Sequence, residues 1–334
     1  MIPNTLRMIC MLFAGAVLFS CANPVIRDVD IYLKQGDYEK AAGILEQAGK
    51  KRPDDGEILM LLAECHGELE HYREFRDILE NKILDSYQYG RRVKFIREKY
   101  WRINYNRAVE SLTKNKLEEA VGFLENAILV DNGKAESYAL LGDTYVRLDR
   151  PDKAIEAYAH HIRIDKKETV YCENVAKLYF ESGQYSRSVE LAREALRRDP
   201  ALFSSYLRLA FAYQEMDSLE AAEAAYKNAL KLGQSVLLFE EYGKFCYRIK
   251  DYESAKEQFS QGLLLSQYAD RFYKYLAECC FGLNDFKNVA AYYEKYLSSR
   301  NDDIEAMKNL LIAYDRLGDT LNYSRIRSLL DDGR

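Results

Sequence analysis

One position, usually small or aliphatic, recurs along this 334-residue chain at a nearly constant interval, and this periodicity constrains the fold more than any other feature. Successive gaps are 34, 34, 34, 33, 34 and 34 residues. A period of that length predicts one supersecondary unit copied along the chain, with each copy burying its apolar face against its neighbours. The recurring residues are Ala120, Ala154, Ser188, Ala222, Ala255, Val289 and Tyr323.

Within each period the apolar residues have helical spacing. In one copy they lie at i, i+3, i+4 and i+7, which places them on one face of a helix. A small residue in that stripe allows a second helix to approach closely, and an aromatic residue of the second helix fills the remaining space. The stripe is Tyr138, Leu141, Gly142 and Tyr145. Glycines that can take a left-handed conformation are expected between helices at Gly36, Gly183 and Gly318.

The pattern resembles the tetratricopeptide repeat, whose Leu-Gly pair, Tyr, Ala, aromatic residue and Pro recur over 34 residues. Leu141-Gly142, Tyr145, Ala154 and Tyr158 carry this resemblance. It implies an all-α superhelical solenoid of antiparallel helix pairs, with about nine such units. The expected organisation is a signal peptide over 1–20, degenerate units over 21–89, an insertion or joint helix over 90–100, and the main array over 101–334.

The amino terminus carries an apolar run, Met8–Phe19, that is too short to span a bilayer and is typical of a signal-peptide core. Cys21 follows, and the ending resembles a bacterial lipobox, although Phe19 departs from the small residue that this motif prefers. Either Cys21 is lipidated and anchors the protein, or the segment is an ordinary signal peptide. Ala22 and Asn23 carry no acidic signal for retention in the inner membrane, which favours the outer membrane. The expected location is the periplasmic side of that membrane.

Composition excludes several functions. A net charge of −5 argues against nucleic-acid binding. The histidines lack the i, i+4 spacing of a helical zinc site, and no phosphate-binding loop or nucleophile motif is present, so we expect no metal, no cofactor and no enzymatic activity. The histidines are His66, His71, His160 and His161. The cysteines beyond the amino terminus are expected to be packing residues.

The best candidate site is a groove lined by the first helices of the repeats. The resemblance places one aromatic residue from each of four consecutive units on the concave face, beside a basic cluster. Such a surface would bind a protein segment. The alternative is that the aromatics pack against the next helix. The residues are Phe180, Phe211, Tyr247 and Phe281, with Lys244, Arg248, Arg271 and Lys274.

A second candidate is the basic segment from Arg91 to Arg107, which contains only Glu98 among acids and has interleaved aromatics. Its alternatives are contact with anionic lipid or an acidic partner, or a solvated helix face.

Together these features predict an envelope-anchored scaffold that binds a partner protein, with a surface-exposed adhesin as the alternative. They leave the partner and the oligomeric state open.

Overall fold

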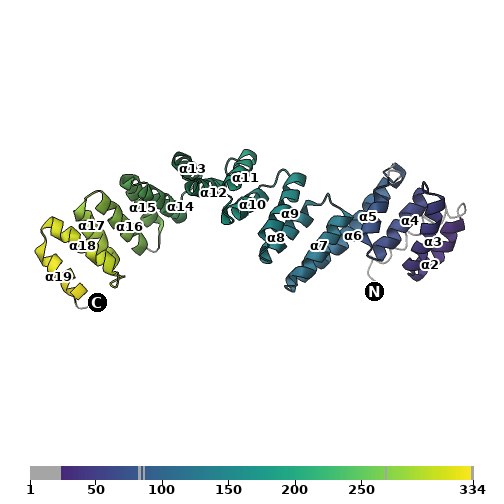
Figure 1. Ribbon diagram of the computed structural model, residues 1–334, viewed down its shortest axis with the longest axis horizontal. Helices are drawn as coiled ribbons and strands as arrows, with labels where there is room; N and C mark the ends of the chain where they lie inside the picture. The colour runs from purple at the N-terminus through teal and green to yellow at the C-terminus, as the bar shows by residue number, and fades with distance from the viewer. Residues whose placement is uncertain (1–23, 82–83, 86, 268, 332–334) are drawn as a thin grey trace, which may run out of the picture. The chain divides into compact units, whose positions relative to one another are not determined.

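The computed structural model describes residues 24–331 except 82, 83, 86 and 268 (Figure 1). All regular secondary structure in that part of the chain is helical, which confirms the predicted all-α fold. The chain divides between Tyr171 and Cys172 into two compact units, here called the N-terminal unit and the C-terminal unit. None of the helices described is both long and apolar enough to cross a membrane.

The described helices form nine successive pairs, as the period predicts. In the N-terminal unit the pairs are α2 (Pro24–Gln35) with α3 (Tyr38–Lys51), α4 (Gly56–Glu68) with α5 (Tyr72–Leu79), α6 (Tyr87–Thr113) with α7 (Leu117–Val130), and α8 (Ala135–Arg147) with α9 (Pro151–Ile164). The next pair is α10 (Val170–Glu181), in which the boundary falls, with α11 (Tyr185–Arg198). The C-terminal unit continues with α12 (Phe203–Glu215) and α13 (Leu219–Leu232), α14 (Val236–Arg248) and α15 (Tyr252–Leu265), α16 (Asp270–Gly282) and α17 (Phe286–Leu297), and α18 (Ile304–Leu317) and α19 (Thr320–Asp331).

The turn inside each pair contains one residue with left-handed backbone. Glycine occupies this position in three turns, as predicted, with φ of 74°, 74° and 69°. In the α8–α9 turn the amide of Arg150 donates to the carbonyl of Tyr145 at 2.9 Å, so the turn satisfies a carbonyl at the end of the first helix. The left-handed residues are Gly36, Glu70, Asn115, Asp149, Gly183, Asp217, Lys250, Asn284 and Gly318.

In two helix pairs a glycine of the first helix lies directly against an aromatic ring of the second. A Cβ atom added to Gly142 would lie 2.4 Å from the ring of Tyr158, and one added to Gly243 would lie 2.6 Å from Phe259. Tyr158 is 2% exposed, and its hydroxyl donates to Asp143 at 2.6 Å. The predicted small–aromatic pairing therefore sets the distance between helices in these pairs.

Residues 90–100 lie within α6, a single helix of 27 residues. Their apolar side chains pack on the preceding pair, since the ring of Tyr100 lies 5.2 Å from that of Phe75, and a Cβ added to Gly67 would be 2.3 Å from Tyr100. The extra residues thus lengthen one first helix without leaving the stack. The division at residues 20, 89 and 100 given in the sequence analysis remains a prediction.

We expect Gly142→Ala to destabilise the protein by about 1–3 kcal/mol, because the added methyl group overlaps a buried ring that cannot move freely. Gly122→Ala on α7 is the matched control, since its Cβ would meet nothing within 4 Å. That change should stabilise by about 0.5–1 kcal/mol through helix propensity. Urea unfolding measures both, and shifts of the same sign would contradict the close-approach argument.

Candidate partner-binding surfaces

Side chains link neighbouring first helices in the C-terminal unit. Ser205 on α12 donates to the carboxylate of Glu173 on α10 at 2.9 Å. Arg271 on α16 pairs with Glu240 on α14 at 3.0 Å. We call the surface of α10, α12, α14, α16 and α18 the first-helix face. It carries all the residues that the sequence analysis selected for partner binding.

Three of the four predicted aromatics pack across the turn of their own helix pair. Each contacts the aromatic residue five positions later, which begins the second helix. Phe180 and Phe281 are half-buried as a result, whereas Tyr247 remains 38% exposed. The ring-centroid distances are 5.4 Å for Phe180–Tyr185, 5.4 Å for Tyr247–Tyr252 and 5.9 Å for Phe281–Phe286.

Phe211 occupies a different position on the face. Its ring lies 6.4 Å from Phe180 on the preceding first helix and 6.3 Å from the buried Tyr226. The guanidinium of Arg208 covers the Phe180 ring at 5.2 Å. Phe211 and Phe180 therefore belong to the packing between neighbouring helix pairs as well as to the surface, and their role in binding remains a prediction.

Much of the predicted basic cluster is neutralised within the face. The Glu240 carboxylate is 9% exposed and lies 2.8 Å from Lys244 Nζ and 3.0 Å from Arg271. Burial alone would lower the pKa of Lys244, but hydrogen bonds to Glu240 and Glu241 outweigh it and raise that pKa. Lys244 and Arg271 are thus brought together around one acid. The i, i+4 spacing of Glu240 and Lys244 was a sequence signal for this contact.

Lys274 is held in the same way. Its ammonium lies 2.8 Å from Asp303, the residue that caps α18 and accepts the amide of Ala306 at 2.9 Å. Tyr296 also donates to Asp303, at 2.9 Å. Burial would raise the pKa of Asp303, but these hydrogen bonds outweigh it and lower that pKa to about 2. Sequence reasoning missed Asp303, because it lies 29 residues from Lys274.

Only a few described residues selected or found on the first-helix face are both exposed and unpaired or apolar. Arg248 is exposed, and no ion pair or hydrogen bond for it is found among the described residues. It directly follows the partly exposed Tyr247 on the last turn of α14. Leu237 on α14 and Ile312 on α18, which the sequence analysis did not select, are 55% and 42% exposed.

In the N-terminal unit, the basic segment contains only Glu98 as an acid, but it also has acidic neighbours from outside the segment. Acids of α4 and of the turn after it, which precede the segment by about 30 residues, pack beside it and pair with three of its cations. Sequence proximity could not show this, because the contacts form between helices. The pairs are Arg92 with Glu57 at 2.8 Å and Glu64 at 3.0 Å, Lys99 with Glu68 at 2.5 Å, and Arg107 with Glu70 at 2.7 Å.

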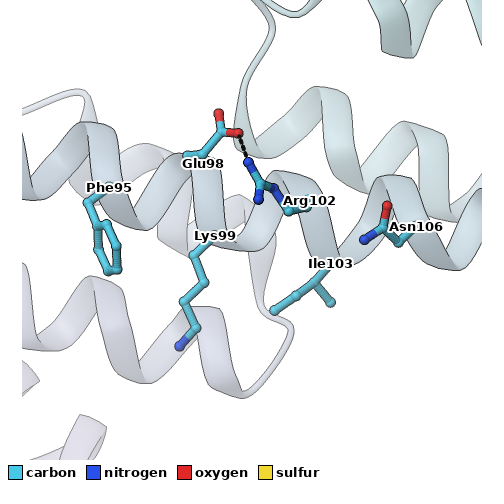
Figure 2. Close-up of a pocket in the computed structure, with 6 residues that line it drawn as sticks. All are labelled: Phe95, Glu98, Lys99, Arg102, Ile103 and Asn106. Atoms are coloured by element: carbon cyan, nitrogen blue, oxygen red, sulfur yellow. Dashed lines mark hydrogen bonds and ion pairs between the residues drawn. The ribbon is translucent and has the colours of Figure 1, made fainter. Parts of the chain in front are cut away.

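One exposed side of α6 is nevertheless uneven and partly apolar. Figure 2 shows Phe95, Lys99 and Ile103 extending to the same side of the helix, while Arg102 pairs with Glu98 at 2.9 Å on another side. Phe95 is 60% exposed. With Asn106 these residues line a shallow hollow of about 390 Å³. This surface is a second, smaller candidate for protein contact.

The described cysteines are buried free thiols. Burial raises the pKa of Cys65, Cys246 and Cys279 to about 12 in each case. A thiol is nucleophilic as its thiolate, so these residues act as small apolar packing groups.

Comparison with known proteins identifies the repeat. One tetratricopeptide repeat model matches residues 32–83, and a second matches 135–168, 170–202 and 203–233. Tetratricopeptide repeats are therefore present in both units.

Two curated relatives are similar over part of the chain. Small glutamine-rich tetratricopeptide repeat-containing protein 2 of Saccharomyces cerevisiae is 30% identical over 135 residues, or 40% of this chain. TPR repeat-containing protein YvcD of Bacillus subtilis is 27% identical over 195 residues, or 58% of this chain. The chain spans 37% of the length of each relative.

Among solved structures, Pseudomonas aeruginosa pilF is 16% identical, with a TM-score of 0.48 over 64% of this chain and 97% of that one. MamA is 17% identical, with a TM-score of 0.46 over 49% of this chain and 90% of that one. At these identities the likeness concerns the fold alone.

We expect Asp303→Asn to lower the free energy of unfolding by about 1–2 kcal/mol at neutral pH, because the carboxylate loses its ion pair with Lys274. The folded-state pKa of about 2 lies below the unfolded value of 3.8. The contribution is therefore complete above about pH 4 and is lost as the pH falls towards 2. Denaturant unfolding from pH 7 to pH 2 measures it. The exposed Asp302→Asn is the control and should change stability by less than about 0.5 kcal/mol. An Asp303→Asn deficit that persists at pH 2 would contradict the assignment.

Proposed function

We propose that this chain is a non-enzymatic scaffold, anchored at the bacterial cell envelope, that binds a segment of a partner protein on the first-helix face of the C-terminal unit. Tetratricopeptide repeats generally mediate binding to proteins or peptides, and such repeats are present here. We further propose that the protein lies at the envelope and helps to assemble outer-membrane or other envelope complexes.

The observation that carries the binding site is the exposed pair Tyr247 and Arg248 on a rigid, well-packed helix. Tyr247 is held by its contact with Tyr252, so it can bury its remaining surface with little loss of side-chain entropy. Arg248 has no internal acid to satisfy it among the described residues. Tyrosine and arginine, with tryptophan, are the residue types enriched among those that dominate binding energy at protein interfaces.

The charge balance of the face refines the expected partner. Lys244, Arg271 and Lys274 already have acidic partners, so a ligand carboxylate would compete with Glu240 and Asp303 for them. Arg248 could pair with a ligand carboxylate without first losing an acidic partner of its own. We therefore expect a partner segment with apolar anchors and one acidic group placed near Arg248, rather than a strongly acidic tail.

The envelope anchor rests on the sequence alone, because residues 1–23 lie outside the described part of the chain. The apolar run Met8–Phe19 followed at once by Ser20 and Cys21 supports export and lipidation. Acyl chains at Cys21 would hold the repeats at the membrane surface.

To test the binding surface, a photo-crosslinking amino acid is placed at position 247 in the full-length protein in cells. We expect a defined adduct with one partner, weakened about tenfold by Arg248→Ala, because a central interface arginine typically contributes 1–2 kcal/mol or more. The control position is Leu264 on α15, which is 78% exposed but belongs to a second helix. Equal adducts from both positions, or an adduct insensitive to Arg248→Ala with unchanged melting, would contradict the proposed surface.

To test the anchor, we expect Cys21→Ser to release the protein from the membrane fraction or to block its processing. Cys10→Ser, inside the apolar run, should change neither. Mass spectrometry of the amino-terminal peptide and membrane fractionation measure the outcome, and protease added to intact cells separates a periplasmic scaffold from a surface adhesin. A Cys21→Ser protein that keeps the parent's fractionation and amino terminus would rule out lipidation there.

A further inference from the structure

The segment after α9 brings one histidine and two carboxylates together at the end of the N-terminal unit. His161 lies in the last turn of α9, Asp165 caps that helix, and Glu168 follows in the connecting segment. One potential ligand atom from each of the three residues lies within 4.8 Å of the others. The sequence analysis expected no metal because it searched for paired histidines, whereas this cluster combines histidine with acids at i+4 and i+7.

The hydrogen bonding of His161 determines which ring nitrogen is available. The ring is buried, with 3% exposure, and Nδ1 lies 3.0 Å from the carbonyl oxygen of Ala135. A carbonyl oxygen can only accept, so Nδ1 carries the hydrogen. In the neutral ring Nε2 then presents a lone pair. A histidine whose second nitrogen donates to a backbone carbonyl is the usual arrangement for a metal ligand.

His161 Nε2 faces the acids rather than a donor. It makes no hydrogen bond among the described residues, although an oxygen of Glu168 lies 3.3 Å away. Two ligands bound at about 2.0–2.1 Å to a tetrahedral ion stand about 3.3 Å apart, so the observed separation suits an ion between them. A bare lone pair beside a carboxylate is otherwise repulsive, and either a metal ion or a proton on Nε2 would remove that conflict.

Asp165 orders the backbone of the segment that carries Glu168. Oδ1 of Asp165 accepts the amides of Lys167 at 2.8 Å and Glu168 at 3.3 Å, which orders the segment and favours the ionised carboxylate. The ring of Tyr171 lies 3.9 Å from that of His161 and covers it. The side chain of Glu168 is 44% exposed, which leaves an entry path from solvent.

We propose that His161, Asp165 and Glu168 bind a divalent transition-metal ion of the zinc class, through His161 Nε2 and one oxygen of each carboxylate. Imidazole with carboxylates suits Zn²⁺ better than Mg²⁺ or Ca²⁺, which prefer oxygen ligands alone. Water completes the coordination. The bound ion joins the segment that carries Glu168 to the end of α9, and the site is independent of the proposed partner binding.

The test is equilibrium dialysis of the tag-free, chelator-treated full chain against Zn²⁺, together with nitrogen NMR of the histidine rings. We expect one saturable ion per chain and a shift of His161 Nε2 on zinc addition. Glu168→Gln and Asp165→Asn should each weaken binding at least tenfold. Glu168 is exposed and Asn at 165 keeps an oxygen for the two amides, so both variants should fold.

Two matched variants control for general effects. Glu156→Gln removes an exposed acid from the same helix, and His160→Gln removes the adjacent histidine, whose ring stacks on Tyr138 at 4.9 Å. Neither should change zinc affinity by more than about twofold. The proposal is overturned if the parent chain takes up no zinc at a saturable site, or if binding survives both carboxylate variants. It is also overturned if the NMR signal of His161 Nε2 does not shift on zinc addition and the spectrum shows this nitrogen carrying a proton beside Glu168 instead.

Discussion

The close contact between a small residue of one helix and an aromatic ring of the next is the constraint on which the structure depends. At Gly142 and Gly243 no side chain heavier than hydrogen fits, so Tyr158 and Phe259 lie directly on the backbone of the partner helix. This contact fixes the distance between the helices of a pair. Because the pair buries only part of its apolar stripe, the next pair must cover the rest, and the helices therefore stack in order.

Stacking also decides which charges remain available to a partner. Glu240 joins Lys244 to Arg271, and Asp303 holds Lys274, so cations that look like a binding cluster in the sequence are internally matched. The same happens in part on α6, where acids of α4 pair with Arg92 and Lys99 of the basic segment. A ligand of such a surface would gain most from the few groups that the stack leaves unmatched, which would make the binding proposed above selective.

The connection after α9 shows a different use of the same architecture. His161 belongs to the packed end of a second helix, and its ring is oriented by a carbonyl of α8. The acids come from the cap and the segment that follows. In the proposed metal site a repeat pair thus supplies a histidine held by a backbone carbonyl, and the connection supplies carboxylates on a segment ordered by hydrogen bonds to Asp165.

The sequence by itself determined the all-α class, the nine helix pairs and the left-handed glycines of three turns, because helical periodicity and the 34-residue interval are local properties of the chain. Only the tertiary structure decided which side chains of the predicted binding surfaces are packed or paired within the protein. Phe180 and Phe281 pack across their own turns, and Arg92 and Lys274 find acids about 30 residues away. Such contacts depend on which faces of neighbouring helices meet, and the spacing of one helix carries no information about its neighbour's charges. The orientation of the His161 ring could not be predicted from the sequence for the same reason, because a backbone carbonyl of another helix sets it.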